Sequence, residues 1–344
     1  MKQTILIVLS ILFHSFFFGQ NSNYSKNNYL TVVSYNVENL FDTIDNPNTL
    51  DEQFLPQSSK KWNTGRYKKK INDIARVISE ININELPEIV GLCEIENRTV
   101  LKDLVNSRFL KNGNYEIVHK DSPDKRGIDV ALLYRKNEFR YIKHQIYPVK
   151  FDFDPETGTR DILYVKGKVN NGEILHIFVN HWNSRREGIE QSEPKRIYTA
   201  KILRSKIDSL LAKDRKAKII VLGDFNDAPE NKSLQKILNA RNNFRTKDSK
   251  ELYNLMFDKS INGAGTYNYK GDWIMFDNII VSQALLHSKK GYIVSPDGAM
   301  IFKKRWMMYD NIKTGQLTPS KTYGGTNYYG GISDHFPVYT ILRK

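Results

Sequence analysis

The stretch IIVLGDFN, at residues 219–226, joins an unbroken apolar run to a polar turn. Four consecutive large aliphatic residues predict a β-strand that is buried on both faces. Asp224 and Asn226 follow at the end of this strand, and loops at the end of a sheet are where a rigid scaffold gathers functional side chains. The stretch therefore predicts a central strand whose end carries a binding or catalytic site.

Segments on both sides of this stretch repeat the strand pattern, and two others have the spacing of amphipathic helices. Strands are expected at residues 30–35, 88–94, 115–118, 129–134, 139–147, 162–169, 174–179, 217–222, 278–281 and 337–342. Asn171-Gly172 indicates a hairpin between two of these strands. Helices are expected at residues 67–81 and 197–210, the second starting near Glu193-Pro194.

The overall organisation follows from these elements. The long polar stretches at residues 42–66 and 295–331 are expected to be surface loops. Strands mixed with helices and hairpins predict the α/β fold class, with helices packed on stacked sheets. No repeat or linker divides the chain, so we expect a single domain from residue 28 to residue 344.

Polar side chains that suit metal and phosphate chemistry stand at the ends of several predicted strands. They are Asn36, Glu94, His181, Asp224, Asn226, Asp277, Asp334 and His335. Any one of the Asp and Asn residues alone is better explained as a turn former. Their recurrence at strand ends throughout one domain favours a shared functional site.

Together these fragments resemble the endonuclease/exonuclease/phosphatase superfamily, which includes apurinic endonucleases, pancreatic-type deoxyribonucleases, neutral sphingomyelinases and inositol-polyphosphate phosphatases. The resemblance spans residues 31–339, and its most specific pair is GDFN at 223–226 with SDH at 333–335. The phrases YNVENLFD at 35–42 and GTY at 265–267 look like a bacterial exported branch. The resemblance implies a four-layer sandwich of two stacked mixed β-sheets flanked by helices, and a metal-dependent phosphoesterase.

The resemblance also implies a metal site. Glu94 is the principal expected ligand, with Asn36 beside it and Asp334 contributing directly or through water. Such an oxygen-rich set suits Mg²⁺, or Mn²⁺ in its place. Cys93 is the only cysteine, which excludes an intramolecular disulfide, and the absence of a His/Cys cluster argues against structural zinc.

The remaining polar residues are expected to perform the chemistry. His335 is the candidate water activator or phosphate contact, and Asp277 is expected to receive its ring N–H. Asp224 and Asn226 are expected to face the same phosphate, and His181 suits a donor to a phosphate oxygen or an acid for the leaving group. Whether His335 or Asp224 is the general base stays open.

Arg126 is a candidate phosphate clamp, although a surface arginine at a strand entry explains its position equally well.

The formal charge of +14 favours a polyanionic partner. Three basic residues directly precede Trp306 at 303–306, and Arg185-Arg186 follows His181, so we expect a nuclease acting on DNA or RNA. The alternatives are a phosphodiesterase or phosphatase acting on lipid headgroups or inositol phosphates, and a surface-binding protein that has lost catalysis. Because every motif residue is present, the last is not favoured.

Residues 1–20 have the pattern of a secretory signal peptide. Lys2 precedes an apolar run, and small or polar residues follow it. A membrane anchor, the alternative, needs about 20 apolar residues, and His14 interrupts this run. We expect cleavage near residue 20 and export to the periplasm or the medium.

Overall fold

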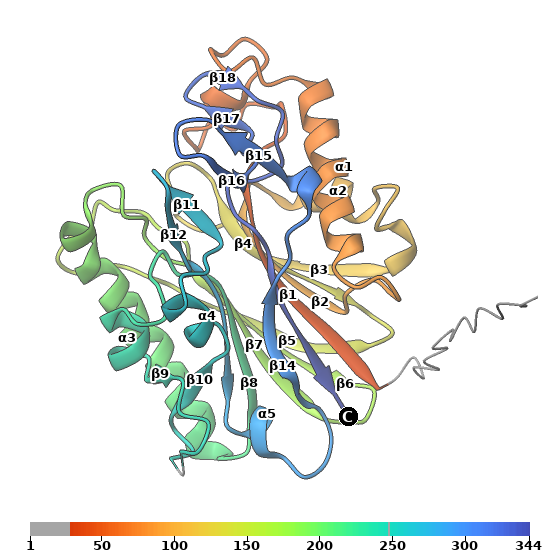
Figure 1. The fold of residues 1–344 in the computed structure, drawn as a ribbon, viewed down its shortest axis with the longest axis vertical. Helices are drawn as coiled ribbons and strands as arrows, with labels where there is room; N and C mark the ends of the chain where they lie inside the picture. Colours follow the sequence, from red (N-terminus) through yellow and green to blue (C-terminus); the bar gives the residue numbers. More distant parts are fainter. Residues whose placement is uncertain (1–27, 247) are drawn as a thin grey trace, which may run out of the picture.

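The computed structural model describes residues 28–246 and 248–344 (Figure 1). The predicted signal peptide at residues 1–20 therefore lies outside the described residues. None of the helices in the described part of the chain is long and apolar enough to cross a membrane.

The first sheet has six strands and is mixed. β1 runs parallel to β2 at its centre, and every other pair of neighbours is antiparallel. In spatial order its strands are β14 (Ile293–Ile301), β19 (Val338–Arg343), β1 (Tyr29–Leu40), β2 (Ile89–Ile95), β4 (Asp129–Arg135) and β3 (Tyr115–His119).

The second sheet has seven strands and is also mixed. Its central parallel pair is β7 with β8, and β13 lies antiparallel on the other side of β8. In spatial order its strands are β5 (Phe139–Tyr147), β6 (Ile162–Val169), β7 (Ile174–His181), β8 (Lys218–Asp224), β13 (Asp277–Ser282), β10 (Leu252–Asn254) and β9 (Ala240–Arg241). The predicted hairpin at Asn171-Gly172 joins β6 to β7, and Gly172 supplies the positive φ of +91° in its turn.

Alternation along the strands builds the layers, because successive side chains point to opposite faces of a sheet. Ile220 and Leu222 face the first sheet and pack in a buried layer with Val32 of β1, whereas Ile219 and Val221 pack against a helix. The run at residues 219–222 is thus buried on both faces, as predicted.

Helices cover the two outer faces of the sheet pair (Figure 1). α1 (Thr64–Glu80) and α2 (Arg98–Val105) pack on the first sheet, and α3 (Ile189–Lys213) packs on the second. The order helix, sheet, sheet, helix is the four-layer sandwich that was predicted. The expected helix starting near Glu193-Pro194 begins earlier, at Ile189, because Gly188 ends the preceding turn with a φ of +106°. Pro194 is accommodated inside the helix, where it can leave only one backbone hydrogen bond unmade.

The prediction of a surface loop over residues 295–331 is wrong for much of its length. β14 enters this stretch and pairs with β19 at the edge of the first sheet. Pro-Asp-Gly at residues 296–298 obscures the strand in the sequence, since this combination normally signals a turn. Here it falls at a shift of register between Val294 and Ala299, and edge strands tolerate such a bulge.

Small elements complete the described chain, most of them near one end of the sheet pair (Figure 1). The short strands form three hairpins: β11 (Tyr267–Tyr269) with β12 (Asp272–Ile274), β15 (Met308–Asn311) with β16 (Gln316–Pro319), and β17 (Tyr323–Gly324) with β18 (Asn327–Tyr328). The short helical turns are η1 (Glu52–Phe54), η2 (Lys111–Gly113), η3 (Ser233–Ile237), α4 (Phe257–Ile261), α5 (Ala284–His287) and η4 (Arg305–Met307).

Candidate active site

The strand register brings the predicted site residues to one end of the sandwich. In the second sheet, Asp224 at the end of β8 is the direct partner of His181 in β7 and of Asp277 in β13. In the first sheet, Asn36 of β1 is the partner of Cys93, which precedes Glu94. Because β1 with β2 and β7 with β8 are parallel pairs, their carboxyl ends meet at the same edge of each sheet. The Nδ2 of Asn36 donates to Asp224 Oδ2 at 2.9 Å, which links the two sheets.

The segment before β19 delivers Asp334 and His335 to the same place. The Ser333 hydroxyl donates to the carbonyl of Asn36 at 2.7 Å and accepts the N–H of His335 at 3.0 Å. A β-bridge joins His335 to Tyr267, and their rings lie 4.9 Å apart. This segment is therefore held between the first sheet and the β11–β12 hairpin.

His335 lies between two carboxylates. Its Nδ1 is 2.7 Å from Asp277 Oδ2, and its Nε2 is 3.8 Å from Asp224 Oδ2. Burial, the largest single effect, lowers the pKa of His335, but Asp277 and Asp224 together raise this pKa well above its ordinary value. Asp277 thus faces one ring nitrogen of His335, and Asp224 lies near the other.

Asp224 is fixed by hydrogen bonds from its own turn and from the other sheet. The backbone N–H of Asn226, which has a φ of +49°, donates to Asp224 Oδ1 at 2.9 Å. Burial raises the pKa of Asp224 to about 6, with His335 opposing this rise and Asp277 adding to it. The side-chain amide of Asn226 donates to the carbonyl of Trp182, so its predicted role as a phosphate donor stays a prediction.

His181 is buried and carries the opposite kind of shift. Burial lowers its pKa well below the ordinary value, and the nearby positive charges of Arg160 and Arg126 lower it further. Its Nε2 lies 3.6 Å from Asp224 Oδ2 and 3.9 Å from Glu94 Oε1. The pKa values of His181 and His335 are therefore shifted in opposite directions beside the same carboxylate.

Glu94, Asp334 and Asn36 are the predicted metal ligands. Glu94 adopts a φ of +65°, a conformation that non-glycine residues rarely hold, and its Oε2 accepts the N–H of Asn39 at 2.8 Å. Burial raises the pKa of Asp334. His335 opposes this rise, and the carboxylate of Glu94 adds to it. Carboxylates that repel each other in a buried site are the donor set that a hard divalent cation neutralises, so these residues fit such an ion.

The amide of Asn36 is already engaged on both sides. Its Oδ1 accepts the N–H of Glu38 at 3.0 Å, while its Nδ2 holds Asp224. A carbonyl oxygen has two lone pairs, so one remains for a cation. Its role as a ligand stays a prediction.

These side chains surround a pocket of about 650 Å³, within the range of small-molecule sites. Asn36 and Asp277 do not line the pocket but contact Asp224 and His335, which do. The predicted residues that line it are Glu94, Arg126, His181, Asp224, Asn226, Asp334 and His335. Arg126 reaches the pocket from the loop before β4. In the same loop, Asp124 forms a buried ion pair with Arg160 at 2.8 Å.

Sequence reasoning missed part of the pocket wall. Tyr269 and Ile274 come from the β11–β12 hairpin, Phe276 follows it, and Ile189 comes from the start of α3. Tyr267 belongs to the GTY phrase at 265–267, and its ring lies beside that of His335. The aromatic cluster YNY at 267–269 was the available signal, but a short aromatic run by itself does not distinguish a pocket wall from a core strand.

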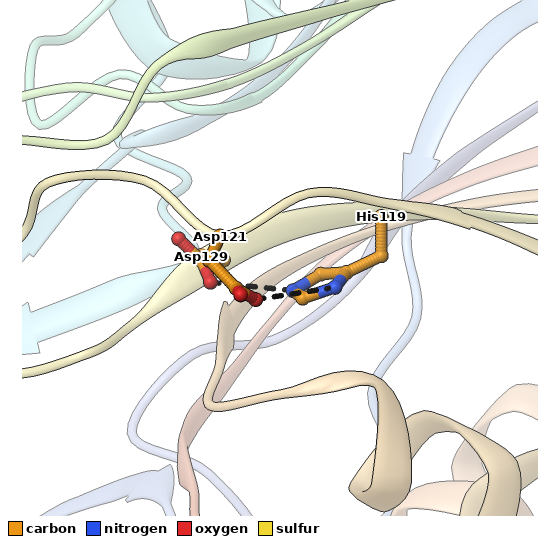
Figure 2. A group of neighbouring side chains, drawn as sticks. All are labelled: His119, Asp121 and Asp129. Carbon is orange, nitrogen blue, oxygen red and sulfur yellow. Dashed lines mark ion pairs between the residues drawn. The ribbon is translucent and has the colours of Figure 1, made fainter. Parts of the chain in front are cut away.

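A second group of possible metal ligands lies at the base of the loop that carries Arg126 (Figure 2). His119 Nε2 lies 3.2 Å from Asp129 Oδ2, and Nδ1 lies 3.8 Å from Asp121 Oδ1. Asp129 also accepts hydrogen bonds from the N–H and hydroxyl of Ser122. Ser122 thus fixes the carboxylate of Asp129 beside the ring of His119.

Comparison with solved structures finds the same fold at low sequence identity. Humanized TDP2 of Danio rerio matches with 15% identity and a TM-score of 0.55, covering 92% of this chain and 99% of that one. A mannosyl-6-phosphatase of Bacteroides thetaiotaomicron matches with 17% identity and a TM-score of 0.56, covering 92% and 100%. D. rerio TDP2 complexed with a single-strand DNA product matches with 14% identity and a TM-score of 0.53, again covering 92% and 100%.

No curated protein sequence matches the chain. The model of the endonuclease/exonuclease/phosphatase family matches residues 31–344, which is nearly the entire described chain. Members of this family hydrolyse phosphoester bonds and generally use divalent metal ions. The chain therefore belongs to the endonuclease/exonuclease/phosphatase family and is a hydrolase of phosphoester bonds.

Proposed function

We propose that this protein is an exported, Mg²⁺- or Mn²⁺-dependent phosphodiesterase that cleaves nucleic acid. The observation that carries the proposal is the pocket in which the His335–Asp277 pair, Asp224 and His181 face the carboxylates of Glu94 and Asp334. Phosphoester hydrolysis requires these functions together: neutralised phosphate oxygens, a base for water and a stabilised leaving oxygen.

The protonation states suggest a division of roles. The His335 imidazolium donates from Nε2 to a non-bridging phosphate oxygen, because Nδ1 is engaged by Asp277. Asp224, with a pKa of about 6, is mainly ionised at neutral pH and accepts the proton of the attacking water. As the bond from water to phosphorus forms, the bond to the leaving oxygen breaks; neutral His181 donates a hydrogen bond to that oxygen, which takes its proton from solvent. A cation held by Glu94 and Asp334, with Asn36, would neutralise the phosphate oxygens.

Charge and similarity support nucleic acid as the substrate. The chain carries a formal charge of +14, and Arg126 and Arg186 line the pocket. A neighbour of the same fold, D. rerio TDP2, was solved with a single-strand DNA product. The similarity to a mannosyl-6-phosphatase favours a second candidate, a phosphatase acting on a small phosphomonoester. Export rests on the sequence pattern of residues 1–20.

A parallel assay tests the proposal. Purified protein with Mg²⁺ is given plasmid DNA, RNA, bis-p-nitrophenyl phosphate, mannose 6-phosphate and sphingomyelin, with the His335→Ala variant as the control. We expect cleavage of DNA or RNA that EDTA abolishes and that Mg²⁺ or Mn²⁺ restores. Undiminished activity in EDTA would contradict the metal requirement, and turnover of only the sugar phosphate or the lipid would contradict the choice of substrate.

A further inference from the structure

The mouth of the active-site pocket presents exposed apolar side chains from two separate segments. Tyr269 of the β11–β12 hairpin is 52% exposed, and Ile189 at the start of α3 is 60% exposed. Single exposed apolar residues need no explanation, but these two line one cavity together with Ile274 and Phe276. Their exposure therefore marks an apolar surface next to the catalytic groups.

The hairpin that presents Tyr269 is braced on its neighbours. The ring of Tyr267 stacks on Phe276 at 5.4 Å and lies against His335. Gln316 of β16 accepts a hydrogen bond from Asn268 at 3.0 Å and donates one to the carbonyl of Gly271 at 3.0 Å. These contacts hold the backbone of the hairpin in place. Binding a ligand at Tyr269 therefore requires little further loss of conformational entropy in the hairpin.

The segment that presents Ile189 is also anchored. Arg185 donates to the carbonyl of Asn226 at 2.8 Å and to the carboxylate of Asp227 at 2.8 Å. This ties the start of α3 to the GDFN turn and leaves Arg186 among the residues that line the pocket. With Arg126 and Arg185 itself, three arginines line the pocket beside an aromatic and aliphatic surface.

The catalytic groups lie below this rim. Asp224 and His335 are 2% and 6% exposed, so a phosphate must enter the pocket to reach them. In a duplex every base is paired and stacked, and exposing its ring requires unstacking that costs a few kcal/mol. An unpaired strand meets no such cost, and aromatic side chains bind its bases regardless of sequence.

We propose that the pocket binds a nucleotide of an unpaired strand, with its base stacked on Tyr269 and in contact with Ile189. The scissile phosphate then lies at His335 and Asp224, and the adjoining phosphate lies at Arg126 and Arg186. The substrate class is single-stranded nucleic acid or the unpaired end of a duplex. This inference rests on the proposed nuclease function and specifies its substrate.

The test compares three substrates at one salt concentration: a single-stranded oligonucleotide, its blunt duplex, and a strand of the same length built from abasic nucleotides. Wild-type protein should cleave the single strand at least about tenfold faster than the duplex. Tyr269→Ala should raise KM for the single strand roughly tenfold with little change in kcat, because the stacked base is lost while the reacting groups stay in place. Tyr269→Phe should retain the wild-type KM, since the ring is kept.

The abasic strand separates stacking from a structural effect. Tyr269→Ala should leave cleavage of this strand unchanged, because an abasic strand has no base that could stack on Tyr269. Ile142→Ala is the matched control, since Ile142 is 42% exposed and is not among the residues that line the pocket. Equal rates on single strand and duplex, or an unchanged KM in Tyr269→Ala, would overturn the inference while leaving the nuclease function intact. Failure of the wild-type protein to cleave any nucleic acid would overturn both.

Discussion

The proton on His335 is the residue-level feature on which the chemistry depends. Two carboxylates outweigh the effect of burial on its pKa, whereas no such carboxylate outweighs burial and two arginines at His181. The pKa values of the two histidines are therefore shifted in opposite directions because their neighbours differ. In the proposed mechanism, this difference separates a charged phosphate donor from a neutral one.

Removing either the proposed phosphate donor, His335, or the proposed base, Asp224, should nearly abolish turnover. His335→Ala and Asp224→Asn are each expected to lower kcat at least about 10²-fold, the scale of losing a general base or an oxyanion donor. Steady-state kinetics with saturating Mg²⁺ measures the effect, and circular dichroism checks that the variants fold. A loss below about threefold in either variant would show that the roles are assigned to the wrong residues.

Asp277 offers a test of the His335 charge that keeps the hydrogen-bond geometry. Asp277→Asn removes a negative charge that raises the pKa of His335. Since the charged ring is proposed to be the active form, activity is lost as pH rises through the pKa of His335. Lowering this pKa should therefore move the alkaline limb of the kcat profile to lower pH. An alkaline limb that does not move in the variant would contradict the charged role of His335.

At the same scale, the sequence could predict the polar residues that meet at the pocket but not the apolar residues that line it. Asp224, Asp334 and His335 are visible in a sequence because polar residue types interrupt apolar strands at their ends. Tyr269 and Ile189 resemble ordinary strand and helix residues, and their role follows from exposure at a shared cavity. That exposure is a property of tertiary packing, and one sequence does not encode it in any local pattern.

Among the elements, the close approach of β7 and β8 positions the site. Gly223 has a φ of +142°, and a Cβ at this position would lie 1.9 Å from the carbonyl oxygen of Asn180. Only glycine therefore allows β8 to approach β7 this closely just before Asp224. The GDFN motif thus begins with a glycine for a steric reason and continues with the functional carboxylate.

Gly223→Ala should accordingly destabilise the fold and displace Asp224. We expect a loss of more than about 3 kcal/mol in the free energy of unfolding, because a backbone clash adds to the conformational strain. Gly315→Ala is the matched control, since Gly315 has a φ of +66° and nothing within 4 Å of its Cβ position. It should lose only about 1 kcal/mol. Urea unfolding of both variants measures these changes. Equal losses of unfolding free energy would argue against a tight contact between β7 and β8.

Prediction of the elements failed where local signals conflict with tertiary pairing. The main strands were found because their apolar runs are long, including the run at 219–222 that is buried on both faces. β14 was missed because Pro-Asp-Gly interrupts it, and pairing with β19 overrides that turn signal. The start of α3 was placed too late, because Pro194 is tolerated inside the helix.

At the scale of the whole molecule, the sandwich brings the predicted metal ligands of one sheet next to the proposed catalytic groups of the other. Glu94 and Asn36 belong to strands of the first sheet, whereas His181, Asp224 and Asp277 belong to the second. The packed layer between the sheets therefore fixes the distance between the expected cation and the proton-transfer groups. Such a site needs both sheets in register, which explains why its residues are scattered over the chain.

The basic surface of the molecule predicts a salt effect. If a polyanionic strand binds through lysine and arginine contacts, affinity falls steeply with salt because condensed counterions are released. Cleavage of DNA at low substrate concentration should therefore drop at least about tenfold between 50 and 200 mM NaCl, while hydrolysis of bis-p-nitrophenyl phosphate changes little. Equal salt dependence for the two substrates would point to a small phosphoester as the natural one.

The proposed catalysis depends most on one cation binding where the two sheets meet. Crystals soaked in Mn²⁺ should show an anomalous scattering peak between the carboxylates of Glu94 and Asp334, with oxygen ligands at about 2.1 Å. The same peak should vanish in crystals of Glu94→Ala. A peak only at the His119, Asp121 and Asp129 group, or no ion between Glu94 and Asp334 at saturating Mn²⁺, would contradict the proposed active site.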